Sequence, residues 1–490
     1  MGRQIKFIAA LPKILNKIIH HFLFFLHCLL SAVQPTLTLT ICCMTNQPKN
    51  FRYNYVLRIA FISALGGYLF GFDFAVIAGA LPFLKDQFAF NEYWEGFATA
   101  SLALGCVAGC LIAGPLSDKY GRKPGLMLAA FLFLISSFAM AFAANKGLFI
   151  SARFVAGIGV GMASMLSPLY IAEISPAETR GRMVALNQLT IVIGILVTNL
   201  VNYSFRNNGP DAWRWMVGLG AVPSAVFLAG VAFLPESPRW LVKAGKEDKA
   251  SVILSKIGNA AYTAASLTSI NNSLQGSNTK FSYAEVFKKA VLPAVTVGIG
   301  LAMFQQFSGI NVVFNFTTTI FESVGFTKDD QLKQTVFIGI VNLLFTLLAM
   351  WQVDKLGRKP LMIIGALGLA VLYVISGLLL QNKSPLAAWP LLAAIGLYAM
   401  TLGPVTWVLI SEIFPNHIRS AATAVAVISM WLSYALLVFT FPIIAGKLGT
   451  YTPFYIYAGI CVLGFWFVKT KVRETKGKSL EDMETVFTGH

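Results

Sequence analysis

Long apolar segments alternate with short polar ones along most of the chain. The apolar segments lie at 56–82, 95–115, 125–144, 147–170, 184–204 and 213–234, and again at 290–324, 335–353, 361–381, 386–410, 421–446 and 451–468. Each is long enough for a helix that crosses a bilayer, which takes roughly 18 to 20 residues. The pattern therefore predicts an all-α membrane protein with 12 transmembrane helices in two six-helix bundles.

The polar stretches divide the chain further. We expect an N-terminal bundle at 44–234, a cytoplasmic linker with short helices at 235–289, a C-terminal bundle at 290–468 and a cytoplasmic tail at 469–490. Residues 1–43 are basic and apolar, but His20, His21, His27 and Pro35 make them a poor span. Because a polar segment begins at Met44, we interpret 1–43 as a leader upstream of the natural start.

The composition supports a membrane location. The chain is 56% hydrophobic and only 12% charged, about half the charged fraction of a soluble protein. Of its 38 Lys and Arg residues, 22 fall in one alternating set of loops and the tail, and eight in the other set. This is the positive-inside bias, so we predict a multi-pass protein of the plasma (inner) membrane with both termini in the cytoplasm. The same placement argues against nucleic acid as a partner for the net charge of +17.

Two motifs occur once in each half. GPLSDKYGRK at 114–123 returns as VDKLGRK at 353–359, and EISPAETR at 173–180 returns as EIFPNHIR at 412–419. Repeats in the same orientation imply an axis along the membrane normal and a substrate near the midplane between them.

These motifs resemble those of a known family. The pattern G-x-x-x-D-[RK]-x-G-R-[RK] at 114–123 is similar to the signature of the major facilitator superfamily. PESPRWL (235–241), QQFSGIN (305–311), GPVTW (403–407) and ETKGKSLED (474–482) resemble its sugar porter family. GGYLFGFD, SPLYIAEISPAETRG and SEIFPNHIRS look like the bacterial xylose–proton symporters. The resemblance implies sugar transport by alternating access, as a monomer in lipid, with a proton as coupling ion and no other cofactor.

Amide side chains in the seventh span are candidates for sugar binding, because an amide both donates and accepts hydrogen bonds. Gln305, Gln306 and Asn311 lie there, and Gly309 permits local unwinding of the helix. The resemblance adds the sugar contacts Gln188, Asn342 and Trp407, and Trp431 as a nearby aromatic. The alternative is that the amides join helices to each other and that the tryptophans are ordinary packing residues.

Some positions depart from the sugar porter pattern. Asn315 and Phe316 stand where the family usually has two tyrosines, Met430 replaces an amide, and Ala399 stands where some animal facilitators have an acidic residue. The sugar that the chain prefers therefore stays open.

Asp73 is a carboxylate inside the first span, where a charge costs at least about 2.5 kcal/mol. Arg153, in the fourth span, is the one basic residue inside a span. The resemblance pairs them as a proton-coupling site. A carboxylate that alternates between an arginine and an open side of the membrane changes its proton affinity during the cycle. The alternative is a permanent salt bridge that sets helix packing.

Charged residues at the predicted cytoplasmic helix ends suggest a gate that breaks and reforms, since arginine binds carboxylates bidentately. The candidates are Asp118, Arg122, Glu173, Arg180, Glu236, Arg239, Asp354, Arg358, Glu412 and Arg419. The alternative is that these charges only mark the topology.

Other functions are less consistent with the sequence. Gly477-Lys478-Ser479 resembles the end of a phosphate-binding loop, but Val472 stands where the first glycine is needed. No catalytic constellation, metal-ligand spacing or cysteine framework stands out, so we predict a protein that is not an enzyme. A passive sugar uniporter and a non-transporting sugar sensor remain as alternatives to a proton-coupled symporter.

Overall fold

The computed structural model describes residues 51–275, 286–288, 291–414 and 418–475, except for the side chains of 274–275, 351–355, 411 and 420. The predictions about the leader 1–43, about the tail beyond Thr475 and about the side chain of Asp354 lie outside the described residues.

The protein is built from helices, and 12 segments of the described chain are long and apolar enough to cross a membrane. The first six spans are α2 (Tyr53–Phe88), α3 (Glu92–Tyr120), α4 (Arg122–Ala141), α5 (Lys146–Ile174), α6 (Arg180–Phe205) and the pair α7 (Ala212–Gly218) and α8 (Ala221–Phe233). The other six are α13 (Leu292–Phe307) with α14 (Ile310–Asn315), α16 (Lys328–Leu356), α17 (Arg358–Gln381), η1 (Pro385–Ala387) with α18 (Ala388–Met400) and α19 (Leu402–Ile413), α20 (Arg419–Leu448) and α21 (Thr452–Lys471). The predicted all-α membrane fold is confirmed.

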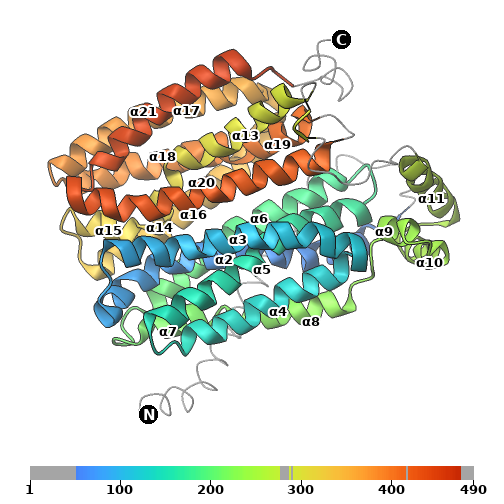
Figure 1. Ribbon diagram of the computed structural model, residues 1–490, viewed down its shortest axis with the longest axis horizontal. Coiled ribbons are helices and arrows are strands. Elements are labelled where there is room, and N and C mark those ends of the chain that lie inside the picture. The colour runs from blue at the N-terminus through green and yellow to red at the C-terminus, as the bar shows by residue number, and fades with distance from the viewer. Residues whose placement is uncertain (1–50, 276–285, 289–290, 415–417, 476–490) are drawn as a thin grey trace. The chain divides into compact units, whose positions relative to one another are not determined.

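Three short helices occupy the polar stretch between the sixth and seventh spans. They are α9 (Pro238–Lys243), α10 (Glu247–Ile257) and α11 (Ala260–Gln275), and they lie together beyond one end of the spans (Figure 1). We call this end of the spans the linker end. The end that carries α7 and α15 (Thr317–Glu322) is called the far end.

Glycines allow the helices of the first half to pack backbone against backbone. A Cβ atom on Gly105 of α3 would lie 2.1 Å from the carbonyl oxygen of Phe154 in α5, and one on Gly157 would lie 2.0 Å from that of Leu102. Gly71 of α2 approaches the carbonyl oxygen of Ile191 in α6 in the same way, at 2.1 Å. Small residues give membrane helices this close approach. It accounts for the glycines around Asp73.

The two halves meet along several pairs of neighbouring elements. α3 packs on α20, α6 packs on α16, and α2 packs on α14 and α15. The middle of α2 therefore faces the broken seventh span across the interface between the halves. Asp73 and the predicted sugar-binding amides are carried by these two elements.

Candidate functional site

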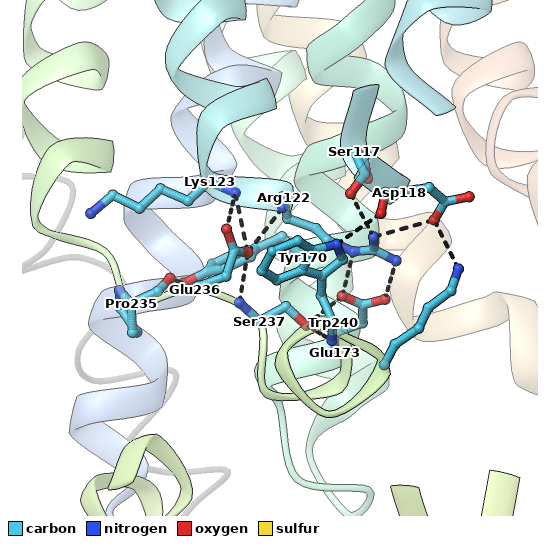
Figure 2. A network of polar contacts seen from close by, with 11 residues as sticks. Ser117, Asp118, Arg122, Lys123, Tyr170, Glu173, Pro235, Glu236, Ser237 and Trp240 are labelled. Atoms are coloured by element: carbon cyan, nitrogen blue, oxygen red, sulfur yellow. Dashed lines mark hydrogen bonds and ion pairs between the residues drawn. The ribbon is translucent and has the colours of Figure 1, made fainter. Parts of the chain in front are cut away.

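At the linker end of the first half, Arg122 is the centre of a charged cluster (Figure 2). Its Nε and Nη2 atoms donate to the two carboxylate oxygens of Glu173, at 2.8 and 2.9 Å. The hydroxyl of Ser237 donates to the same carboxylate at 2.6 Å. Asp118 lies at the rim, 3.5 Å from Arg122 and 3.4 Å from Lys243. The cluster joins α3, α4, α5 and α9.

Glu236 caps the N-terminus of α4. Its carboxylate accepts the main-chain N–H groups of Arg122 at 2.9 Å and Lys123 at 3.2 Å, two donors that the helix itself leaves unpaired. The partial positive charge of the helix end favours this carboxylate. Gly121 makes room for it, with φ of +105° and a position where a Cβ atom would lie 2.2 Å from the carboxylate. This explains the glycine of the G-R-K motif.

The second half repeats the arrangement. Glu474 accepts the main-chain N–H groups of Arg358 and Lys359 at 3.0 Å each, next to Gly357 with φ of +90°. Glu412 lies 3.4 Å from the guanidinium of Arg358 and accepts the hydroxyl of Thr475 at 2.5 Å.

The pair Glu474–Thr475 therefore corresponds to Glu236–Ser237. This third repeat was not predicted from the sequence. Its signal is an acidic residue followed by a hydroxyl residue, E-S and E-T, at an offset close to that of the other two motifs.

The predicted gate is thus divided into two clusters, each within one half. In the chain as described, no ion pair joins the halves at the linker end, and neither Arg180 nor Arg239 forms an ion pair. Arg419 donates to the carbonyl oxygen of Phe414 at 3.1 Å. The gating role of these residues remains a prediction.

The predicted sugar-binding amides of the seventh span form one connected group. Gln306 donates to Gln305 at 3.3 Å, and Asn311 donates to Gln306. Gln305 also donates to the carbonyl oxygen of Gly403 at 3.0 Å, where the tenth span is broken between α18 and α19. The expected unwinding is present, because α13 ends at Phe307 and Gly309 has a φ of +85°.

The other candidates lie on four different helices. Gln188 of α6 is half-buried and Asn342 of α16 is buried, and neither forms a hydrogen bond with the residues that the structure describes. Trp407 of α19 is 38% exposed. Trp431 of α20 is buried, with its ring 5.5 Å from that of Phe70 in α2. The polar groups of Gln188 and Asn342 are therefore available to a ligand.

Asp73 and Arg153 are both buried, yet their charged groups are not bonded to each other. Arg153 donates from Nε to the carbonyl oxygen of Ala98 at 3.0 Å and from Nη2 to the main-chain oxygen of Asp73 at 3.5 Å, while Nη1 has no partner among the described residues. Within the described chain the carboxylate of Asp73 forms no ion pair or hydrogen bond. The salt bridge that would make this pair a static brace is absent from this conformation.

At the far end, by contrast, polar contacts join the two halves. Arg206 at the end of α6 pairs with Asp329 of α16, and Lys328 lies 2.8 Å from Asp86 of α2. Asn199 donates to the carbonyl oxygen of Thr335 at 2.7 Å.

Another cross-half contact at this end involves the buried side chain of Glu95. The hydroxyl of Thr319 in α15 donates at 3.0 Å to Glu95 of α3, which is also 2.7 Å from Lys85. None of these far-end contacts was predicted from the sequence, since their partners are far apart in the chain and follow no motif.

Comparisons with known proteins cover nearly the whole chain. Residues 59–487 match a family described as "Sugar (and other) transporter". The D-xylose-proton symporter of Escherichia coli (strain K12) is 38% identical over 481 residues, which cover 89% of this chain and 97% of that protein. The arabinose-proton symporter of Bacillus subtilis (strain 168) is 37% identical over 449 residues, which cover 90% and 96%.

Solved structures agree with the sequence matches. The inward open conformation of the xylose transporter from E. coli superimposes with a TM-score of 0.78 at 37% sequence identity, over 88% of this chain and 100% of that one.

Proposed function

The chain belongs to the family of sugar (and other) transporters, and on that basis we propose that it is a proton-coupled sugar symporter that works by alternating access. The membership confirms the resemblance drawn from the motifs and the prediction of a transport protein that is not an enzyme. Two relatives that match over almost their full length are named proton symporters, for xylose and for arabinose. A pentose is therefore the substrate class that we propose first.

One observation carries the proton-coupling part of the proposal. Asp73 and Arg153 are buried neighbours across α2 and α5 whose charged groups are not bonded to each other. A buried carboxylate without a partner is costly when it is charged, and an arginine keeps its charge. This geometry suits an Asp73 that holds a proton here and gives it up when the helices move and the arginine approaches.

The cluster of amide side chains in the seventh span supports the proposal that the protein binds a sugar. Gln305, Gln306 and Asn311 lie at the break of the seventh span, and such breaks line substrate sites near the midplane of transporters. Gln188, Asn342 and Trp407 lie on the fifth, eighth and tenth spans, and Trp431 lies on the eleventh. We assign sugar binding to these residues, because their donors and acceptors match sugar hydroxyls and their rings match the apolar face of a pyranose.

The contacts between the halves support a conformation that opens at the linker end. Polar contacts cross between the halves at the far end, whereas in the described chain no ion pair crosses at the linker end. If the linker end is cytoplasmic, as the basic loops predict, this is an inward-facing state. We propose a plasma-membrane protein with both termini in the cytoplasm that functions as a monomer.

The test is uptake of radiolabelled D-xylose by liposomes that contain the purified protein, with and without an inward proton gradient. Accumulation above equilibrium only with the gradient is the expected result. Equilibration to the same level under both conditions would instead establish a passive uniporter. Saturable binding of xylose without any uptake would indicate a sensor.

A further inference from the structure

Tyr434 lies where the elements that carry the two proposed sites meet. It is a buried residue of α20, 1% exposed. Its ring lies 5.8 Å from that of Phe74, the residue that follows Asp73 in α2, and 5.9 Å from that of Trp431. Arg153 is close enough to interact electrostatically with both Asp73 and Tyr434. The tyrosine therefore borders the proposed proton site.

The hydroxyl of Tyr434 is also bonded to the broken seventh span. It accepts a hydrogen bond of 2.8 Å from the side-chain amide of Asn315, the last residue of α14. The same amide donates to the main-chain oxygen of Asn311 at 2.6 Å. Asn311 in turn donates to Gln306, which donates to Gln305. A continuous series of polar contacts thus leads from Tyr434 to the proposed sugar-binding amides.

This link involves one of the positions at which the chain departs from its family. Where sugar porters usually have a tyrosine, the chain has Asn315, and the phenol of Tyr434 contacts Asn315 from a different helix, α20. Asn315 is fully buried and its Oδ1 atom has no partner among the described residues. Within the described chain the side-chain hydrogen bonds of Asn315 are thus confined to Asn311 and Tyr434.

We propose that Tyr434 is a positioning residue that couples proton binding to sugar binding. Its hydroxyl holds Asn315, and through it α14, in a place that depends on how α2 and α20 pack beside Asp73 and Arg153. A change in the charge of Asp73 shifts that packing, and the amides of α14 move with it. The inference rests on the proposed symport function and adds to it the residue that connects the two sites.

The physical requirement is that both sites bias the same element. α14 is a suitable element because it is one short helix, Ile310–Asn315, separated from α13 by Gly309 and from α15 by Phe316. The other ionisable side chain that acts on Arg153 is Cys106 of α3. Cys106 is also close to Tyr434, and among the described residues it forms no hydrogen bond with α14.

The test compares Tyr434→Phe with wild type in proteoliposomes, with radiolabelled D-xylose as probe. Two rates are measured: xylose exchange without a gradient and accumulation driven by an inward proton gradient. Sugar affinity is measured over a range of pH. Tyr373→Phe is the matched control, because Tyr373 is a buried tyrosine of the same half whose hydroxyl has no partner among the described residues.

We expect Tyr434→Phe to exchange xylose at a rate close to that of wild type while it accumulates at least about fivefold less, the lower limit of typical coupling between two sites. The dependence of its sugar affinity on pH should flatten. Tyr373→Phe should behave as wild type. Tyr434→Phe that accumulates as wild type does would overturn the inference. An equal loss of exchange and accumulation would overturn it too, because the residue would then belong to the binding site alone.

A second pair of variants keeps the test decisive if removal of the hydroxyl impairs folding. Asn315→Tyr combined with Tyr434→Asn exchanges the two partners at nearly constant volume and keeps one phenol and one amide in place. It should recover much of the accumulation that Tyr434→Asn alone loses. Absence of recovery in a folded double variant would contradict the inference. Failure of the symport proposal is recognised separately, since wild type itself would then show no accumulation.

Discussion

The carboxylate of Asp73 is buried in the first span and has no hydrogen-bond or ion-pair partner in the described chain. A negative charge on this carboxylate is therefore energetically costly in this conformation. We expect Asp73→Asn to retain xylose exchange and to lose gradient-driven accumulation, because an amide keeps the shape of the side chain but cannot bind and release a proton. Exchange and accumulation in proteoliposomes measure the two properties separately.

Asp211→Asn is the matched control for this substitution. Asp211 is an aspartate of the same half that pairs with Arg214 at 3.1 Å near the surface. The Asp211→Asn variant should retain both xylose exchange and gradient-driven accumulation. Accumulation by Asp73→Asn at the wild-type level would exclude the residue from proton coupling and leave Arg153 as a packing residue.

Gln305 has a different role from that of Asp73, because its amide is already partly used by the protein. It donates to the carbonyl oxygen of Gly403 and accepts from Gln306. Gln305→Ala should weaken sugar binding by about 1–3 kcal/mol, the cost of leaving buried hydrogen-bonding groups unpaired. Isothermal titration of the purified protein with D-xylose measures this directly.

The control for this change is Gln331→Ala. Gln331 is another buried glutamine of the second half that donates to a main-chain oxygen, that of Phe326 at 2.8 Å, but it lies at the far end. Its substitution should affect stability and not sugar affinity. Unchanged affinity in a folded Gln305→Ala protein would remove Gln305 from the sugar site.

At the scale of elements, the break between α13 and α14 decides where the amides point. Gly309 has a φ of +85°, and a Cβ atom there would lie 2.3 Å from the ring of Tyr457 in α21. Gly309→Ala should therefore destabilise the protein by more than the ~1–2 kcal/mol that a left-handed conformation costs an alanine. It should also weaken sugar binding, since α14 must shift.

Gly325→Ala separates the effect of backbone strain at a positive φ from the effect of the clash with Tyr457. Gly325 has a nearly identical φ of +86°, but nothing lies within 4 Å of a Cβ atom placed there. Thermal unfolding in detergent should show a smaller loss for Gly325→Ala than for Gly309→Ala. Equal losses would mean that backbone strain acts alone and that contact with Tyr457 contributes nothing.

Elements with a regular pattern were predictable from the sequence, and contacts between distant elements were not. Hydropathy was sufficient to locate every span, and the motif QQFSGIN indicated the break at Gly309. The cap formed by Glu474 was missed because its repeat consists of only two similar residues. Tyr434 was missed because an aromatic residue in an apolar helix is indistinguishable from core packing until the partner of its hydroxyl, Asn315 on another helix, is known.

For the pair Asp73 and Arg153, the sequence identified the residues but not how their side chains are bonded. Residue type and position were enough to bring the two residues together, because a buried charge needs an explanation. The sequence could not give their geometry. That geometry depends on how closely the glycines let α2 pack on α6 and α3 on α5, and on which main-chain oxygens Arg153 then reaches.

At the scale of the whole molecule, the structure is asymmetric between its two ends. The clusters around Arg122 and Arg358 each stabilise one half as a unit, whereas at the far end Arg206, Asp329 and their neighbours join the halves. A transporter that works by alternating access needs two halves that each move as a rigid body. It also needs contacts between the halves that are weak enough to break. Surface ion pairs, at ~0–1 kcal/mol each, meet the second requirement.

Asp329→Asn removes the charge that α6 and α16 share at the far end, where the Arg206 and Asp329 side chains are 24% and 40% exposed. The far end should open more often, by a few-fold at most, because an exposed ion pair stabilises a contact only weakly. Spin labels on cysteines introduced at Asn208 and Lys383, in far-end loops of the two halves, report the distance distribution by pulsed electron resonance. High salt should shift the distance distribution of the wild type in the same direction by screening the pair, with little further effect on the variant.

Asp330→Asn is the control, since Asp330 bonds only to Lys333 and Thr327 of its own half among the described residues. A wild-type distribution in Asp329→Asn, or an equal shift in Asp330→Asn, would show that the cross-half pair does not hold the far end closed.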